Sequence, residues 1–252
     1  MQDSATANRF GFLSALFTTA AGVVAFGLAI TALPIAGANC ASNCVPYPYM
    51  GTAGQWPKDF LWQPPAILFI LGYLALMLSI HYAVPVQRKI LSLAALCLAL
   101  VSATVLAIDY YVQFAVVPAS LQANEANGLP LLIQYNPHGL FIALEELGYL
   151  AMSLSFVLVA SALILGGRLE AGIRWVFRTA FGVSIVAMAA YWFGYGIDRK
   201  DRFEVVILSA CWIALIVNGA LLAVFFRRRL NVDAPAPEAS KRSSAGADDT
   251  TS

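Results

Sequence analysis

The stretch ILSLAALCLALVSATVLAI, residues Ile90–Ile108, contains nineteen residues and no charged side chain. A helix rises about 1.5 Å per residue, so this stretch is long enough to cross a hydrocarbon core of about 30 Å. Charged residues flank it on both sides, with Arg88 and Lys89 before it and Asp109 directly after it. The stretch therefore predicts a transmembrane helix with its ends at the two membrane boundaries.

Similar runs with few or no charges recur along the chain, and each is about 20 residues long. They lie at Gly11–Ile35, Pro65–Val84, Leu147–Gly166, Thr179–Ile197 and Val205–Phe226. The chain is 60% hydrophobic and 12% charged, about half the charge of an ordinary soluble domain. We expect an all-α, polytopic membrane helix bundle with six transmembrane helices over residues 1–230. Residues 231–252, rich in Ala, Pro, Ser and Asp, are expected to form a disordered tail.

The positive charges of such a six-helix chain are distributed unevenly between the two sides. Eleven of the fifteen Lys and Arg residues fall on the side of the two termini, and the triplet Arg227–Arg229 directly follows the last apolar run. Loops rich in Lys and Arg stay in the cytoplasm. The sequence therefore predicts a multi-pass protein of the cytoplasmic membrane, in contact with membrane lipids, with both termini inside. It indicates no nucleic-acid partner.

Two cysteines lie close together in the first predicted outside loop, in the segment NCASNC. A disulfide can persist on that side of the membrane. The spacing C-x3-C without a nearby histidine is a weak pattern for a metal site, and no second pair completes it. We expect a small structural disulfide between Cys40 and Cys44, with free thiols as the alternative. No metal or other cofactor is expected.

Carboxylates collect where the predicted helices end on the outside. Asp109 follows the third helix, Glu145 and Glu146 precede the fourth, and Asp198 ends the fifth. The run Leu147–Gly166 is long enough to span the membrane without either glutamate. We therefore expect a ring of carboxylates at the outer boundary of the membrane rather than in its interior.

The link between the third and fourth predicted helices, residues 109–146, is the longest and is unusually apolar. Its segments VQFAVVPASL and GLPLLIQY suit a stretch that lies on the membrane surface or folds back over the helix ends as a lid. Asp109 and Gln113 share a face if the third helix continues, and His138 and Glu145 do so if the fourth begins near Pro137. Any site is expected to open to the outer face between these two helices.

The segments DYYVQFAVVPASL and LIQYNPHGLFIALEELGYLAMSLSF resemble a block found in small prokaryotic six-helix membrane proteins with no assigned function. The resemblance covers about residues 105–160 and implies a prokaryotic plasma membrane protein, but it carries over no catalytic residue. LEELGYL is also similar to the paired-glutamate motif of the intramembrane CAAX-type proteases. Leu150 stands where that motif has an arginine, which argues against this activity.

Two functions are compatible with these features. The first is a membrane enzyme that acts on an apolar or lipid-like substrate, such as an isoprenoid, by carboxylate acid–base chemistry at the outer face. A carboxylic acid in an apolar pocket can donate a proton, and aromatic faces stabilise positive charge. The candidate catalytic residues are Glu145, Glu146, Asp109 and His138, and the candidate substrate-binding residues are Tyr110, Tyr111, Gln113, Tyr149, Trp192 and Tyr195.

The second function is that of a transport, binding or accessory membrane protein. Its outer carboxylates would bind a cation, couple a proton to a solute, or hold the loops together by pairing with Arg199, Lys200 or Arg202. Asn218, near the middle of the last predicted helix, is expected to bond a neighbouring helix. A homo-oligomer is compatible with either function.

Overall fold

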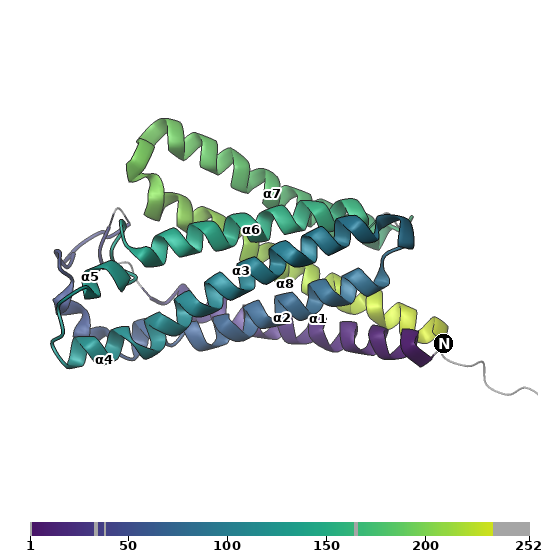
Figure 1. Cartoon of the computed structure of the whole chain (residues 1–252), viewed down its shortest axis with the longest axis horizontal. Helices are drawn as coiled ribbons and strands as arrows, with labels where there is room; N and C mark the ends of the chain where they lie inside the picture. The colour runs from purple at the N-terminus through teal and green to yellow at the C-terminus, as the bar shows by residue number, and fades with distance from the viewer. Residues whose placement is uncertain (1, 33–34, 38, 164–165, 234–252) are drawn as a thin grey trace, which may run out of the picture.

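The computed structural model describes residues 2–32, 35–37, 39–163 and 166–233 (Figure 1). Six of its helices are long and apolar enough to cross a membrane. They are α1 (Gln2–Ala29), α2 (Gln63–Ala83), α3 (Lys89–Ala115), α6 (Leu140–Ala162), α7 (Arg168–Tyr195) and α8 (Lys200–Asp233). No strand occurs in these ranges, which confirms the predicted all-α membrane bundle. Most of the predicted tail, from residue 234 on, lies outside the described residues.

The six long helices form a ring in which neighbours run antiparallel. Helix α1 packs against α2 and α8, α3 lies between α2 and α6, and α7 packs against α6 and α8. A direct contact between α6 and α8 crosses the ring and leaves α7 on the outside of the other five. In Figure 1, α7 leans away from the bundle toward the end where it joins η4 (Gly196–Arg199).

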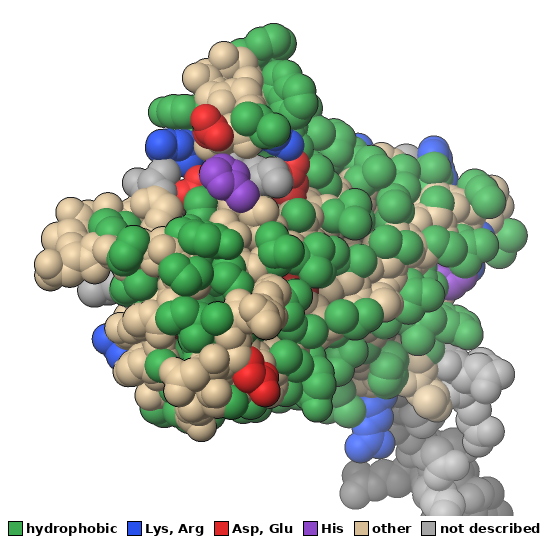
Figure 2. All heavy atoms as spheres, turned by 60° about the vertical axis from the view of Figure 1, so that its left-hand side comes forward, with side chains coloured by type: hydrophobic (Ala, Val, Ile, Leu, Met, Phe, Trp, Pro, Cys, Tyr) green, Lys and Arg blue, Asp and Glu red, His purple; other side chains and the backbone are tan. Residues whose placement is uncertain are grey.

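The two ends of the bundle differ in their connections. Helix α1 begins and α8 ends at one end, called here the terminal end, where residues 84–88, including η3 (Val86–Arg88), and residues 163–167 join helices. The longer links, residues 30–62 and 116–139, lie at the opposite end, the loop end. They contain η1 (Met50–Gln55), η2 (Lys58–Phe60), α4 (Val117–Gln122) and α5 (Leu129–Leu132). Figure 2 turns the loop end forward and shows hydrophobic side chains over much of it.

The link of residues 116–139, named the lid below, folds back over the ends of the helices. It has a small apolar core of its own, formed by Val117, Leu121, Leu129 and Ile133 together with Tyr49 and Phe60 of the first long link. Asn136 fixes its last turn, because its side-chain amide donates a hydrogen bond of 2.7 Å to the carbonyl of Pro130. Of the two arrangements that the sequence allowed for this apolar link, the structure shows the lid.

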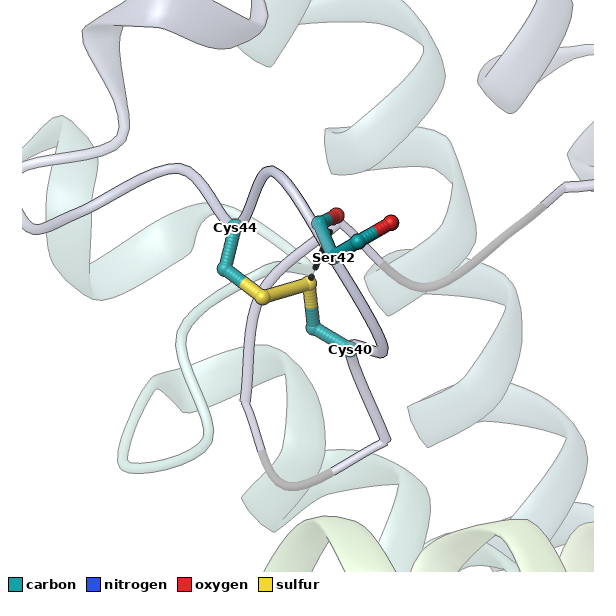
Figure 3. The surroundings of a disulfide bond; sticks show 3 residues. All are labelled: Cys40, Ser42 and Cys44. Carbon is teal, nitrogen blue, oxygen red and sulfur yellow. Dashed lines mark hydrogen bonds between the residues drawn. A yellow bond between two sulfur atoms is a disulfide. The ribbon is translucent and has the colours of Figure 1, made fainter.

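The first long link contains the expected disulfide. Cys40 and Cys44 are bonded, with Cα atoms 5.9 Å apart. Figure 3 shows the tight turn that this bond closes around Ser42, whose carbonyl oxygen lies 3.6 Å from Sγ of Cys40. The bond restrains an exposed turn at the loop end.

The fourth long helix is shifted along the chain relative to the apolar run that predicts it. The run spans Leu147–Gly166, whereas α6 covers Leu140–Ala162. Hydropathy locates the apolar residues, but the helix continues through Glu145 and Glu146, about one and a half turns from its start. Both glutamates, expected to precede the fourth helix at the outer boundary of the membrane, therefore lie within α6, and Glu145 is fully buried in the bundle.

Asn218 makes the interhelical bond that its position predicts. Its side-chain amide donates to the carbonyl oxygen of Ile173 at 3.2 Å and so ties α8 to α7. Because buried polar groups in a membrane lack water as a partner, such bonds hold neighbouring helices in register.

The close packing of α3 on α6 depends on Gly148. A Cβ atom at this position would lie 2.5 Å from Cγ of Leu106. We expect Gly148→Ala to destabilise the protein by about 1–3 kcal/mol through overpacking, measured as a lower melting temperature in detergent. Gly182→Ala in α7 is the matched control, since nothing lies within 4 Å of its Cβ position and alanine favours a helix. Equal melting temperatures of the two variants would contradict this packing.

Candidate functional site

Three carboxyl groups from three helices converge inside the bundle near the loop end. Asp109 of α3, Glu145 of α6 and Glu204 of α8 are only 3%, 0% and 9% exposed. The carboxyl groups of Glu145 and Glu204 lie within hydrogen-bond reach of each other, and Asp109 is close enough to interact electrostatically with both. Within the described ranges, none of the three forms a salt bridge with a basic residue.

One oxygen of Glu145 is held by a chain of hydrogen bonds. Tyr110 donates its hydroxyl proton to Oε1 at 2.6 Å, and the hydroxyl groups of Tyr110 and Tyr149 are bonded to each other. Nε1 of Trp212 donates to the Tyr149 hydroxyl at 2.6 Å. Because the proton of Tyr110 goes to Glu145 and an indole N–H can only donate, Tyr149 must donate to Tyr110. Every bond in the chain thus points toward the carboxyl group, and such chains strengthen cooperatively.

The other side of the carboxyl cluster is not satisfied in this way. Oε2 of Glu145 and Oδ2 of Asp109 have no hydrogen-bond partner among the residues the structure covers. The Glu204 carboxyl group beside Glu145 cannot donate while it is ionised, because a carboxylate only accepts. Two carboxylates side by side in an apolar interior repel each other unless a proton or a cation lies between them. The arrangement therefore provides a place for positive charge.

A pocket of about 450 Å³ opens beside Glu145 and Glu204. Its walls are largely apolar and aromatic, with residues from α1, α6, α8 and the first long link. These include Phe26, Ile30, Trp62, Phe141, Val205 and Leu208. Ile30, just after α1, and Val205, near the start of α8, are 66% and 48% exposed, so the pocket opens between these two helices and not between α3 and α6, where the sequence predicted a site. An apolar molecule in the membrane could reach the carboxyl pair by this route.

The lid covers the pocket at the loop end. Tyr135 donates a hydrogen bond of 3.0 Å to Oδ2 of Asp59, and both side chains line the pocket. Gln134 accepts a bond from Gln63 at 3.1 Å and donates to the backbone oxygen of Asp59 at 3.3 Å. Burial raises the pKa of Tyr135 and the Asp59 carboxylate raises it further. The phenol therefore stays a neutral donor, and the bond that fastens the lid persists through the physiological pH range.

Some of the predicted site residues meet in this cluster. Asp109, Tyr110, Glu145 and Tyr149 are all buried there. Gln113 shares a face with Asp109 as predicted, but it holds the lid: its amide oxygen accepts from the backbone N–H of Gln134 at 3.0 Å and its nitrogen donates to the carbonyl of Leu132.

Glu146 faces away from the pocket, because adjacent residues on a helix point about 100° apart. Its Oε1 lies 2.5 Å from Nη2 of Arg199, and both side chains are largely buried. The pair ties α6 to η4. Arg199 is thus the structural partner that the sequence suggested for an outer carboxylate, and Glu146 has no direct access to the pocket.

The remaining predicted residues lie apart from the pocket. The side chains of Tyr111, Trp192 and Tyr195 are exposed on the surface of the bundle. The guanidinium groups of Arg199 and Arg202 lie 4.6 Å and 4.4 Å from the ring centroids of Trp192 and Tyr195. These three aromatic residues do not line the carboxyl pocket.

His138 is separated from the carboxyl cluster by the start of α6. The helix begins at Leu140, so His138 precedes it and the condition for a shared helical face with Glu145 is not met. The imidazole is exposed, and its Nε2 lies 3.7 Å from Oδ1 of Asp198. The predicted proton relay from His138 to Glu145 has no support in this arrangement.

Sequence reasoning missed two acidic residues and one tryptophan of the site. Glu204 lies just after the charged segment DRKDR, which is typical of a solvent-exposed loop. Its i+3 and i+7 neighbours on the helix, Ile207 and Cys211, are nevertheless fully buried. Asp59 lies before an apolar run and carries no such signal. Trp62 is buried and packs edge-on against Tyr110 with ring centroids 5.0 Å apart.

Comparison with protein-family models, with curated proteins and with solved structures finds no match for this chain. The residues that the structure describes contain no group of three His, Cys, Asp or Glu side chains arranged to hold a metal ion. The chemistry of the site therefore has to be inferred from the carboxyl cluster, its hydrogen bonds and the adjoining pocket.

We expect Glu145→Gln to keep or raise the melting temperature in detergent. The amide oxygen can accept the bond from Tyr110, and the amide nitrogen supplies the donor that Glu204 lacks. Tyr149→Phe should instead destabilise the protein by about 1–3 kcal/mol, because it leaves the buried N–H of Trp212 without an acceptor. A large loss of stability in Glu145→Gln would show that this carboxyl group is structural.

Proposed function

We propose that the protein is a multi-pass enzyme of a prokaryotic cytoplasmic membrane that acts on an apolar, lipid-like substrate by acid–base chemistry of the Glu145–Glu204 pair. One observation carries the proposal: a fully buried carboxyl oxygen without a donor belongs to a residue that lines an aromatic-walled pocket. Unsatisfied polar groups are costly in a membrane interior, and ionisable residues retained there commonly serve function.

The distribution of charge supports an orientation with both termini inside. Arg88, Lys89, Arg168 and Arg227–Arg229 lie at or near the terminal end, and positively charged segments remain in the cytoplasm. The disulfide lies at the loop end, which fits the oxidising side of the membrane. The pocket then belongs to the outer half of the membrane.

The form of the pocket supports a substrate that arrives from the membrane. Its exposed apolar residues, Ile30 and Val205, follow the end of α1 and the start of α8, while Gln134 and Tyr135 close it toward the loop end. An isoprenoid chain would lie against Phe26, Trp62 and Leu208 with little loss of apolar contact on leaving the bilayer. The lid would limit access of water to a reactive intermediate.

The carboxyl pair can supply both halves of an acid–base reaction without a cofactor. A proton from the pair adds to one carbon of a substrate double bond, whose π electrons form the new C–H bond and leave a carbocation. The partner carboxylate then removes a proton from a neighbouring carbon, and that C–H electron pair forms the new double bond. The net reaction moves a double bond and returns the proton to the pair. The surrounding ring faces would stabilise the cation.

The packing between the pocket and the terminal end favours an enzyme with its site on one side of the membrane over a transport path that crosses it. Between Tyr149 and the terminal end, the core is filled by buried apolar side chains from several helices. These include Met77, Ile80, Met152, Phe156, Phe177 and Leu222. Transport sites generally lie near the bilayer midplane, whereas this pocket lies near the loop end.

Deuterium exchange tests the proposal directly. Membranes containing the full chain are incubated in D₂O with polyprenyl lipids from the expression host, and mass spectrometry follows deuterium bound to carbon. We expect exchange in one class of isoprenoid lipid that falls about 10²-fold or more in Glu145→Gln and in Glu204→Gln, the scale of a lost acid or base. Glu125→Gln removes a charge from an exposed residue of the lid and should exchange like the wild type. If wild type and Glu145→Gln exchange equally, the enzymatic proposal fails.

A further inference from the structure

The charged residues that line the pocket beside Glu145 are all acidic. Asp59, Glu145 and Glu204 line it, and a smaller cavity of about 160 Å³ shares Glu204 with it and adds Asp201. None of the described residues that line either cavity is a lysine or an arginine. Arg199 is bonded to Glu146, and the guanidinium group of Arg202 lies over the ring of Tyr195. The electrostatic potential inside the pocket is therefore set by carboxyl groups.

Aromatic rings make up much of the remaining wall. Phe26, Trp62, Tyr135 and Phe141 come from four different segments and all line the same pocket. Trp62 is held in place by the edges and faces of Tyr110 and Trp212, with ring centroids 5.0 Å and 6.2 Å away. Aromatic faces attract cations, and tryptophan does so most strongly. Carboxyl groups and fixed aromatic rings around one cavity together favour an organic cation.

The absence of a hydrogen-bond donor to Oε2 of Glu145 also favours a positively charged ligand. Oε2 is fully buried and without a partner, and Glu145 lines the pocket. A neutral apolar molecule would add no positive charge to the carboxyl pair, and an anion would add a further negative charge to the cluster. A molecule that carries positive charge on an apolar body would satisfy the carboxyl pair and fill a cavity of about 450 Å³.

We propose that this pocket selects its occupant by positive charge and binds a lipophilic cation, such as an amine or a quaternary ammonium ion with apolar substituents, between the Glu145–Glu204 pair and the rings of Trp62 and Phe141. The inference deepens the proposed function and rests on it in one respect: such an ion has the charge and shape of the carbocation that protonation of the substrate would form. The pocket would then bind the intermediate better than the neutral substrate.

Two ions of nearly the same shape and opposite charge test this selection. The full chain is reconstituted in phosphatidylcholine nanodiscs, whose lipid has no net charge, and the binding of tetraphenylphosphonium and tetraphenylborate is measured by equilibrium dialysis against empty nanodiscs. We expect saturable binding of tetraphenylphosphonium at one site per chain. Tetraphenylborate should bind no more than it does to empty nanodiscs. Equal saturable binding of both ions would overturn the proposal.

Variants locate the binding site. Glu145→Gln and Glu204→Gln should each weaken tetraphenylphosphonium binding about tenfold or more, and Trp62→Leu should weaken it less. Glu125→Gln, which removes the same charge from the exposed surface of the lid, should leave the affinity unchanged. An unchanged affinity in Glu145→Gln would overturn the assignment. Should a pocket variant fail to fold, the comparison of the two ions on the wild-type chain still decides.

The two proposals fail in distinguishable ways. If tetraphenylphosphonium binds selectively but no lipid gains deuterium, the pocket binds cations and the enzymatic function is wrong. If deuterium exchange depends on Glu145 but the two ions bind alike, the enzymatic proposal is supported and the proposed selection by charge is wrong. If both hold, tetraphenylphosphonium should inhibit the exchange in proportion to its occupancy of the site.

Discussion

The structure depends on how the bundle accommodates one buried carboxyl group, that of Glu145. A polar group that leaves water for an apolar interior is stable only when its surroundings replace the lost hydrogen bonds. Here Tyr110 of α3, Tyr149 of α6 and Trp212 of α8 form a chain of donors that ends on Oε1. Three helices are thereby fixed relative to one another at the same depth, next to the point where α6 and α8 touch.

Only one of the two oxygens of this carboxyl group receives a hydrogen bond. Oε1 has its donor, whereas Oε2 has none, and both Glu145 and Glu204 line the pocket. A protein selected for stability alone would replace Glu145 with glutamine, which suits both neighbours. Under the proposed function, the carboxyl group of Glu145 is the stability cost that a site for proton transfer or cation binding requires. The lid, fastened through Asp59 and Tyr135, closes this unsatisfied side toward the loop end.

The sequence predicted the architecture because apolar runs of membrane length carry a strong signal. Six helices, the apolar lid, the disulfide and the bond from Asn218 all followed from local composition and spacing. The site was predictable only in part. Glu145 and Glu146 are adjacent and chemically identical, and only the position of Arg199 shows which one is paired. Glu204 and Asp59 were missed because their burial depends on helices and links distant in the chain.

The site depends on the opposition of Glu145 and Glu204 across a shared place for positive charge. A double-mutant cycle of Glu145→Gln and Glu204→Gln, with the free energy of unfolding measured in detergent, tests it most directly. Either change alone should relieve the opposition, so the double variant should gain less than the sum of the two single changes, by about 0.5–3 kcal/mol. Additive effects would contradict the account, because they would show that the two carboxyl groups do not interact.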